Sequence, residues 1–361
     1  MNVDFSKRYG FLLIMIVILA AAAVFSSCIG SQEAGKGGTP VAQEQAGEET
    51  TGEGLEQSEA GPDQQAEEPG AICPIDGQKI GGMPVRPIAV TIDNYRAARP
   101  QSGLDKADLV YEIPVEGGIT RYLAIYFHGE TAKVGPIRSA RPYLIDIARE
   151  WGAVYIHIGQ SPQAQVYFSR TKVAHINQMY HSSGFWRDKS RKAPHNLYSS
   201  TADLRVEMEA LGWNVPTPVE SFSFVEDGGA ATGAAASGIT INYYYGAVSY
   251  RYDSASGLYL RYLDGAPYRD LEAGGQLSAS NVLIQRVPLR SFDAEGRLEI
   301  DLTGEGEMLF FSGGIVESGS WKKDSVTSRT KYYNGSGAEI TFRPGQTWIQ
   351  MVSRNTQVSY E

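Results

Sequence analysis

Hydrophobic positions fall into short runs and regular repeats from Arg86 onward, and these patterns predict a series of strands and helices. The segment RPIAVTIDN (86–94) is an apolar run that ends in a polar turn, which predicts a strand. The segment LVYEIPVEGGITRYLAIYF, Leu109–Phe127, has two strand-like halves with a break at Glu116, Gly117 and Gly118. This arrangement is typical of a β-hairpin.

A helix is predicted next by four recurring apolar residues. Ser139 is placed to cap this helix, Pro142 suits its first turn, and Gly152 ends it. The spacing i, i+3, i+4 and i+7 predicts one buried stripe made of Leu144, Ile147, Ala148 and Trp151. Further along, the pattern predicts a strand at Ala153–Gly159. It also predicts a helix that begins at Gln160-Ser161-Pro162 and another helix at Thr201–Leu211.

The texture of the sequence changes at a glycine- and alanine-rich segment, FVEDGGAATGAAASG, Phe224–Gly238. Beyond this segment, short alternating runs such as ITINYYY and VSYRYD are separated by glycine-rich turns, which predicts an all-β sandwich or partly closed barrel. Before it, strands and helices are mixed. We therefore predict an α+β fold, with a mixed α/β domain at residues 71–223, a Gly/Ala linker at 224–238 and an all-β domain at 239–361.

The first 28 residues have the features of an export signal. Lys7 and Arg8 precede an apolar run at Phe11–Val24, and small residues follow up to Cys28. The run is shorter than the about 20 residues that a membrane-spanning helix needs. Its end resembles a lipobox, with Phe25 where leucine is usual, so residues 1–28 predict a lipoprotein signal peptide with lipidation (palmitate) at Cys28. An uncleaved signal anchor is the alternative interpretation.

Negative charge is concentrated in one stretch of the chain. The formal net charge is −9, and residues 29–70 contain ten acidic residues, one basic residue and no aromatic residue. Such a segment cannot offset the entropy cost of folding, so it predicts an acidic disordered tether. We expect a lipid-anchored protein on the extracytoplasmic face of the cell membrane. The nearly neutral remainder gives no indication of a nucleic-acid partner.

The sequence contains no complete catalytic or metal-binding motif. Its five histidines have neither an H-x-H nor an H-E-x-x-H spacing, so we expect no metal and no cofactor. Cys73 is the only cysteine besides Cys28 and is expected as a small apolar residue of the core. Ser161 lies where a nucleophile elbow would lie, but Gln163 stands where that motif has its second glycine. Ser161 is better explained as a helix cap.

Two glutamates on the predicted hairpin form a second candidate. Glu112 and Glu116 would lie about 13 Å apart in an extended strand, whereas paired glycosidase carboxylates lie about 5–9.5 Å apart. Pro114 could bend the chain and shorten that distance. An ion pair across the hairpin between Glu116 and Arg121 is the simpler interpretation.

Two arginines lie at a helix start, where the helix dipole favours acidic residues instead. Arg138 and Arg141 are thus placed against local preference, which indicates a function such as binding a carboxylate or phosphate. Internal salt bridges to Asp93, Glu112 or Glu116 are the alternative. We predict one polar, metal-free groove, in which these arginines lie within about 15 Å of His195. Its predicted members are Glu116, Arg121, Arg138, Arg141, His157, Ser161, Arg191, His195 and Asn196.

Long segments of the chain resemble the YerB-like family of bacterial lipoproteins. The matching segments include VGPIRSARPYLIDIAREWGAVYIHIGQSPQA and FWRDKSRKAPHNLYSS in the first half, and YLRYLDGAPYRDLEAGGQLSASNVLIQ and PGQTWIQMV in the second. The resemblance covers nearly all of residues 86–352 and implies a two-domain envelope lipoprotein. It implies no chemistry, since no function is known for the family.

The sequence leaves open whether the protein is an enzyme. We expect a ligand-binding or scaffolding module at the cell wall, whose groove holds a peptidoglycan-derived or peptide ligand. Exposed aromatic residues such as Trp321 and Trp348 would assist, although a core position suits Trp348 better. The alternative is a cell-wall hydrolase or transferase that uses the same groove, and the missing catalytic motif favours the binding module. The oligomeric state cannot be predicted.

Overall fold

The computed structural model describes residues 70–225 and 233–361. The predicted signal peptide with Cys28, the predicted tether and the middle of the predicted linker lie outside the described residues. Within those residues, no helix is both long enough and apolar enough to cross a membrane.

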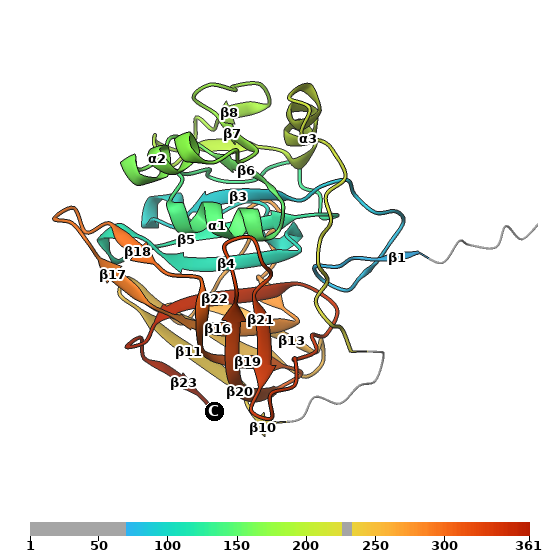
Figure 1. Cartoon of the computed structure of the whole chain (residues 1–361). Coiled ribbons are helices and arrows are strands. Elements are labelled where there is room, and N and C mark those ends of the chain that lie inside the picture. The colour runs from blue at the N-terminus through green and yellow to red at the C-terminus, as the bar shows by residue number, and fades with distance from the viewer. Residues whose placement is uncertain (1–69, 226–232) are drawn as a thin grey trace, which may run out of the picture. The chain divides into compact units, whose positions relative to one another are not determined.

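One long mixed sheet runs through the described part of the chain (Figure 1). Near its middle, β22 lies parallel to β4, with Ile349 opposite Tyr111, so two strands that are far apart in the sequence pair there. The two segments predicted as separate domains therefore contribute to the same sheet. In spatial order the strands are β10 (Ala234–Ala235), β20 (Ile315–Lys323), β19 (Gly304–Ser312), β16 (Asn281–Val287), β22 (Thr347–Ser353), β4 (Leu109–Pro114), β5 (Thr120–Tyr126), β3 (Ile88–Asp93), β6 (Val154–His157) and β7 (His175–Asn177), and β21 (Lys331–Asn334) pairs with β20.

A second sheet packs against one face of the long sheet through buried residues such as Ile241, Tyr250 and Tyr259. It contains β14 (Ala266–Pro267), β13 (Leu258–Leu263), β12 (Gly246–Asp253), β11 (Gly238–Tyr243) and β23 (Val358–Tyr360), with β15 (Ser278–Ala279) paired to β13. Three small antiparallel pairs complete the strands: β1 (Ala71–Ile72) with β2 (Lys79–Ile80), β8 (Phe185–Arg187) with β9 (Leu197–Ser199), and β17 (Leu289–Ser291) with β18 (Leu298–Ile300).

Three α-helices occur in the described residues: α1 (Pro142–Glu150), α2 (Pro162–Arg170) and α3 (Thr201–Ala210). Three short 3-10 helices lie in loops: η1 (Arg96–Ala98), η2 (Leu104–Lys106) and η3 (Glu116–Gly118). The predicted stripe of α1 is fully buried, and Gly152 ends the helix with a left-handed backbone. The predicted cap was wrong, because Arg141 and not Ser139 is the N-cap residue and its side chain makes no capping hydrogen bond.

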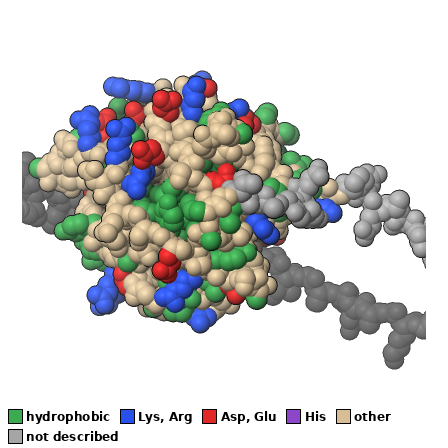
Figure 2. All heavy atoms as spheres, turned by 90° about the horizontal axis from the view of Figure 1, so that it is seen from below, with side chains coloured by type: hydrophobic (Ala, Val, Ile, Leu, Met, Phe, Trp, Pro, Cys, Tyr) green, Lys and Arg blue, Asp and Glu red, His purple; other side chains and the backbone are tan. Residues whose placement is uncertain are grey.

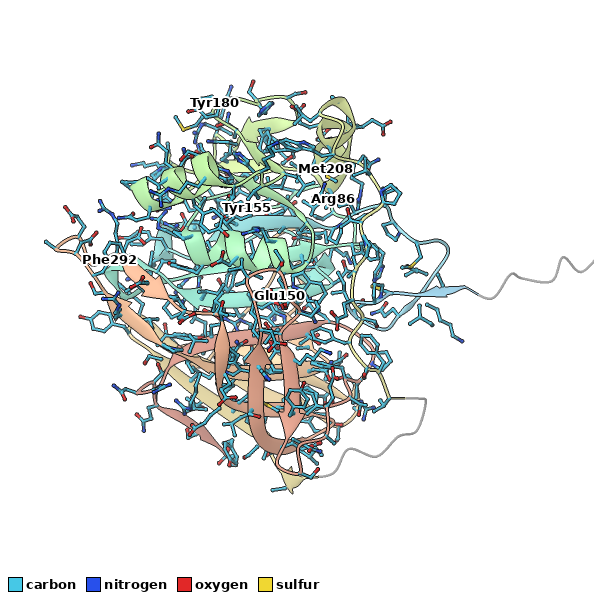
Figure 3. The ribbon with its side chains drawn as sticks, viewed as in Figure 1. Arg86, Glu150, Tyr155, Tyr180, Met208 and Phe292 are labelled. Carbon is cyan, nitrogen blue, oxygen red and sulfur yellow. The ribbon has the colours of Figure 1, made fainter. Side chains whose placement is uncertain are left out.

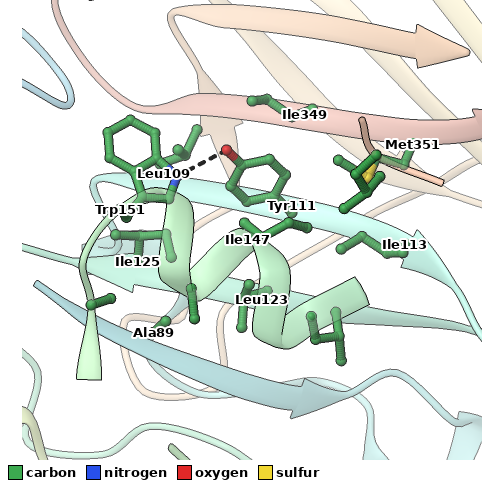
Figure 4. Packing of buried hydrophobic residues seen from close by; sticks show 14 of the residues in the cluster. Ala89, Leu109, Tyr111, Ile113, Leu123, Ile125, Ile147, Trp151, Ile349 and Met351 are labelled. Atoms are coloured by element: carbon green, nitrogen blue, oxygen red, sulfur yellow. Dashed lines mark hydrogen bonds between the residues drawn. The ribbon is translucent and has the colours of Figure 1, made fainter. Parts of the chain in front are cut away.

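Helix α1 is held on the sheet by apolar packing (Figure 4). Leu144, Ile147 and Trp151 lie in the same core cluster as residues of β4 and β5. The indole Nε1 of Trp151 donates a hydrogen bond of 2.9 Å to the hydroxyl of Tyr111, so its polar edge is satisfied. Each such side chain contributes about 1.5–3 kcal/mol through burial. This packing fixes α1 against β4 and β5.

The predicted fold class is confirmed, since helices and strands are mixed in the first half and the described residues after 233 form strands only. Both ends of the predicted linker contact the body of the protein: Phe224 pairs with Phe342, and β10 pairs with β20. The suggestion that Trp321 is exposed was wrong, whereas the core position favoured for Trp348 is confirmed. Both are completely buried, because both faces of the long sheet are covered in this region.

Candidate active or binding site

The parallel strands β3, β6 and β7 end at the same edge of the long sheet. Their last residues are Asp93, His157 and Asn177. In open α/β sheets, ligands bind beyond the carboxyl ends of the strands, so this edge is where a site is expected. The segment that carries Arg138 crosses the same edge, because the Arg138 amide donates to the carbonyl of Thr91 and its carbonyl accepts from the Ile158 amide.

Asp93 is the centre of the first polar group at this edge. Its buried carboxylate accepts a 2.7 Å hydrogen bond from Nδ1 of His195, and the same oxygen lies 3.0 Å from Nε of Arg138. Its other oxygen accepts from the Tyr95 amide at 2.9 Å. The rings of Tyr95 and His195 stack with centroids 5.1 Å apart. Arg138 and His195 therefore meet on one carboxylate.

Glu116 is the centre of the second group. Its carboxylate receives a two-pronged contact from the guanidinium of Arg141, with Nε 2.9 Å from Oε2. Arg121 approaches the same carboxylate at 3.7 Å and donates to the Ser139 carbonyl at 2.7 Å. The two groups adjoin, because Arg121 lies opposite Asp93 in the β3–β5 register. Of the three partners weighed as the salt-bridge alternative, Asp93 pairs with Arg138 and Glu116 with Arg141, whereas Glu112 pairs with Arg261.

The joined groups, hereafter the arginine cluster, contain more cationic than anionic side chains. Within the described residues, the ion pairs of Arg121, Arg138 and Arg141 are with Asp93 and Glu116 alone. Burial lowers the pKa of Arg121 and also that of Arg138, where Asp93 opposes the effect and Arg121 adds to it. Among the described residues, Nε of Arg121 has no hydrogen-bond partner although it is buried. Buried cations without full compensation favour a bound anion.

A cavity of about 400 Å³ opens beside Arg141. One wall is formed by the first turns of α1 and α2, and the other by the β17–β18 hairpin, whose connecting loop carries the exposed Phe292 (Figure 3). The hydroxyl of Tyr143, another residue of the wall, is buried and has no partner among the described residues. Small-molecule sites have volumes of about 300–1,000 Å³, so this cavity can hold part of a ligand next to the arginine cluster.

Three predicted members of the groove have structural roles. Ser161 caps α2 by accepting a 3.2 Å hydrogen bond from the Ala164 amide, although it also lines the cavity. Arg191 donates to the carbonyls of Ala98 and Pro100, both at 2.6 Å. Asn196 donates to two backbone carbonyls and accepts from Arg187. The loop that contains Arg191 and Asn196 is held in this way with His195 over Asp93.

His157 is a core residue beneath α2. Its ring stacks on Tyr155, Phe168 and His175. Its two nitrogens are occupied by the Gly159 carbonyl at 2.8 Å and by Nδ1 of His175 at 3.0 Å. Burial lowers the pKa of His157 to about 3, so the ring is neutral in the folded protein at physiological pH. His157 therefore fits the alternative weighed for it, a satisfied histidine of the core.

This neutral histidine predicts a loss of stability in acid. The unfolded chain takes up the proton near pH 6.5 and the folded chain only near pH 3, so stability is present above pH 6.5 and falls as the pH drops below it. From pH 7.5 to pH 5, His157 should account for about 2 kcal/mol of lost unfolding free energy. Urea unfolding of the wild type and of H157F at both pH values tests this. Equal losses in the two proteins would contradict it.

Sequence reasoning identified the arginines but missed the central role of Asp93. Asp93 entered only as a candidate ion-pair partner, although its position at the end of a buried strand was a signal for the sheet edge. Tyr95 and Tyr143 were missed altogether, because a single tyrosine in a loop or a helix has no spacing that marks it as functional. Tyr95 and Tyr143 lie at the site only because of the order in which the strands pair in the sheet, and a short stretch of sequence does not reveal that order.

Comparison with known families and structures identifies the class of protein. A model described as "Protein of unknown function (DUF3048) N-terminal domain" matches residues 77–214, and the model of the DUF3048 C-terminal domain matches residues 239–349. The chain therefore belongs to the DUF3048 family.

A named relative makes the assignment more specific. The chain is 33% identical over 272 residues to the Bacillus subtilis (strain 168) protein "Putative lipoprotein YerB". The aligned region covers 74% of this chain and 81% of the relative. It also matches the crystal structure of the YerB protein from Bacillus subtilis, with a TM-score of 0.72 and 31% identity, over 80% of this chain and 99% of that one. The predicted resemblance to the YerB-like family is confirmed.

Proposed function

We propose that this protein is a lipid-anchored lipoprotein of the cell envelope that binds an anionic, wall-derived ligand at the arginine cluster. The anchor is supported by the lipobox-like segment before Cys28 and by the name of the Bacillus subtilis relative. The acidic segment 29–70 would give the folded part reach from the membrane toward the wall.

The excess of positive charge in the arginine cluster is the observation that supports anion binding. Three buried or half-buried arginines meet two carboxylates, and Arg121 keeps one buried N–H without an acceptor among the described residues. A carboxylate or phosphate would supply both the missing negative charge and the missing acceptor. Arginine recognises these groups through paired hydrogen bonds, which are stronger than neutral ones.

Both the stem peptides of peptidoglycan and the phosphate polymers of the wall carry such anions. Carboxylates are favoured, because the cavity beside Arg141 combines apolar walls from Phe292 and Ile300 with the polar cluster, as a peptide ligand requires. Basic and acidic side chains are interspersed on the face shown in Figure 2. That face therefore offers no general attraction to a polyanion.

Co-sedimentation with purified sacculi tests the proposal. The wild type should pellet with sacculi, and R138Q should bind about tenfold more weakly or worse, because a charged contact is lost. R138Q should unfold close to the wild type, since Asp93 keeps its bonds to His195 and Tyr95. The matched control is R251Q, which removes an exposed arginine that stacks on Tyr262.

Two kinds of sacculi separate the sources of the anion. Binding that survives acid removal of phosphate polymers supports recognition of carboxylates. Binding that disappears after this treatment supports recognition of phosphate. Equal pelleting of the wild type, R138Q and R251Q would overturn the assignment to the arginine cluster.

The Asp93–His195 pair supports a second candidate, a wall hydrolase. His195 is oriented by a buried carboxylate, and its Nε2 makes no hydrogen bond to a described residue, as a general base requires. Ser161 is occupied as a helix cap, so the nucleophile would be water. Mass spectrometry of sacculi incubated with the protein should detect released muropeptides, and H195Q should release none. If the wild type also releases none, this candidate is excluded.

A further inference from the structure

A second group of polar side chains lies away from the arginine cluster and shares no residue with it. Cys73, Asp76, Asp108 and His128 bring a thiol, two carboxylates and an imidazole together, with one ligand atom of each within 4.8 Å of all the others. The first two residues belong to the turn between β1 and β2, the third precedes β4, and the fourth follows β5. All but His128 are buried.

The histidine faces both carboxylates with a single nitrogen. Nε2 of His128 lies 2.9 Å from Oδ2 of Asp76 and 2.7 Å from Oδ1 of Asp108. One N–H can point at only one of these oxygens. Among the described residues, no lysine or arginine forms an ion pair with either aspartate. The two buried carboxylates therefore exceed the one positive charge that His128 can offer, and a divalent cation would balance them.

Backbone amides hold these ligand atoms in place from behind. The Ile75 amide donates to the Cys73 sulfur at 3.4 Å, and the Gln78 amide donates to the other oxygen of Asp76 at 3.1 Å. Asp108 uses its second oxygen to accept from the Phe127 amide. Such outer contacts orient metal ligands and are a regular part of metal sites. They leave one oxygen of each aspartate directed at the centre of the group.

We propose that Cys73, Asp76, Asp108 and His128 bind one zinc ion. A thiolate together with an imidazole selects zinc over calcium or magnesium, which prefer oxygen ligands alone. The two residues between Cys73 and Asp76 match the close spacing of ligand pairs in structural zinc sites. Four protein ligands complete a tetrahedral shell, so the site is structural and has no open position for a substrate.

The zinc ion fastens the beginning of the folded part. It ties the β1–β2 turn, residues 73–76, to the long sheet at the start of β4 and the end of β5. The predicted tether ends at residue 70, directly before β1. Histidine spacing gave no sign of this site, because its ligands come from three segments and only one of them is a histidine.

Metal titration of the full-length protein, extracted in detergent and freed of metal by a chelator, tests the site. Zinc should bind with one equivalent per chain and raise the unfolding temperature. Cobalt(II) should bind with the same stoichiometry and give a thiolate-to-cobalt charge-transfer absorption, which requires Cys73 as a ligand. Loss of a residue that only hydrogen-bonds to a metal ligand weakens metal binding about 10–100-fold. H128Q removes a ligand itself, so it should weaken zinc binding by more than that.

H181Q is the matched control, because His181 is a surface histidine that pairs with Glu207. It should bind zinc as the wild type does. The cobalt spectrum of the wild type answers the question even if H128Q fails to fold. A wild type without charge-transfer absorption at one equivalent of cobalt would overturn the proposal, and so would equal zinc affinities of the wild type and H128Q.

Discussion

Replacing Glu112 with glutamine is expected to lower the free energy of unfolding by about 3–5 kcal/mol. Glu112 on β4 and Arg261 on β13 form a completely buried ion pair of 2.6 Å that joins the two sheets. Tyr122 and Trp348 enclose the guanidinium. E112Q would leave Arg261 charged and completely buried without a counter-ion, and the cost of that desolvated charge is the reason for the large effect.

Urea unfolding measures this effect, with E299Q as the matched control. Glu299 pairs with Arg290 at the surface, where both side chains are more than half exposed, so E299Q should cost less than about 1 kcal/mol. A double variant, E112L with R261M, should be more stable than E112Q, since it removes both charges. A loss of less than 1 kcal/mol for E112Q would show that the pair does not hold the sheets together.

Replacing Glu150 with glutamine is expected to be about as damaging, with a loss of roughly 3–5 kcal/mol. Glu150 lies at the end of α1 (Figure 3). It pairs with Lys323 and Arg329, each at 2.5 Å. Burial acts to raise the pKa of Glu150, but these two cations outweigh burial and lower it. E150Q would leave the buried side chains of Lys323 and Arg329 without a counter-ion. The guanidinium of Arg329 lies directly over the ring of Trp151.

Chemical unfolding of E150Q should show a lower midpoint with an unchanged slope. D324N is the control, because Asp324 pairs with Lys322 at the surface, where both side chains are more than half exposed. If E150Q and D324N unfold at the same urea concentration, the ion pairs of Glu150 do not anchor α1 to the C-terminal strands.

Local patterns in the sequence predicted the local structure well. The hairpin at residues 109–127 and the stripe of α1 follow from periodicities that are visible in a short window. The cap of α1 was misassigned, because Ser139 has the preferred residue type but the backbone first becomes helical at Pro142. Residue type alone cannot locate a helix start within three positions.

Long-range arrangement could not be predicted in the same way. β22 pairs with β4 although more than half of the sequence lies between them. No local pattern in either strand indicates which strand it pairs with. The same limitation applies to the candidate site. Arg138, Asp93 and His195 meet because β3 ends beside a loop from much later in the chain, and sequence spacing does not record that contact.

Calorimetric titration with a soluble muropeptide tests whether the arginine cluster recognises an anion. The ligand should be compared with the same muropeptide after its free carboxylates are amidated, which removes charge and changes little else. Binding to the wild type should weaken about tenfold or more on amidation, and this difference should vanish in R138Q. Equal affinity of the wild type for the two ligands would show that the arginine cluster does not recognise the carboxylates.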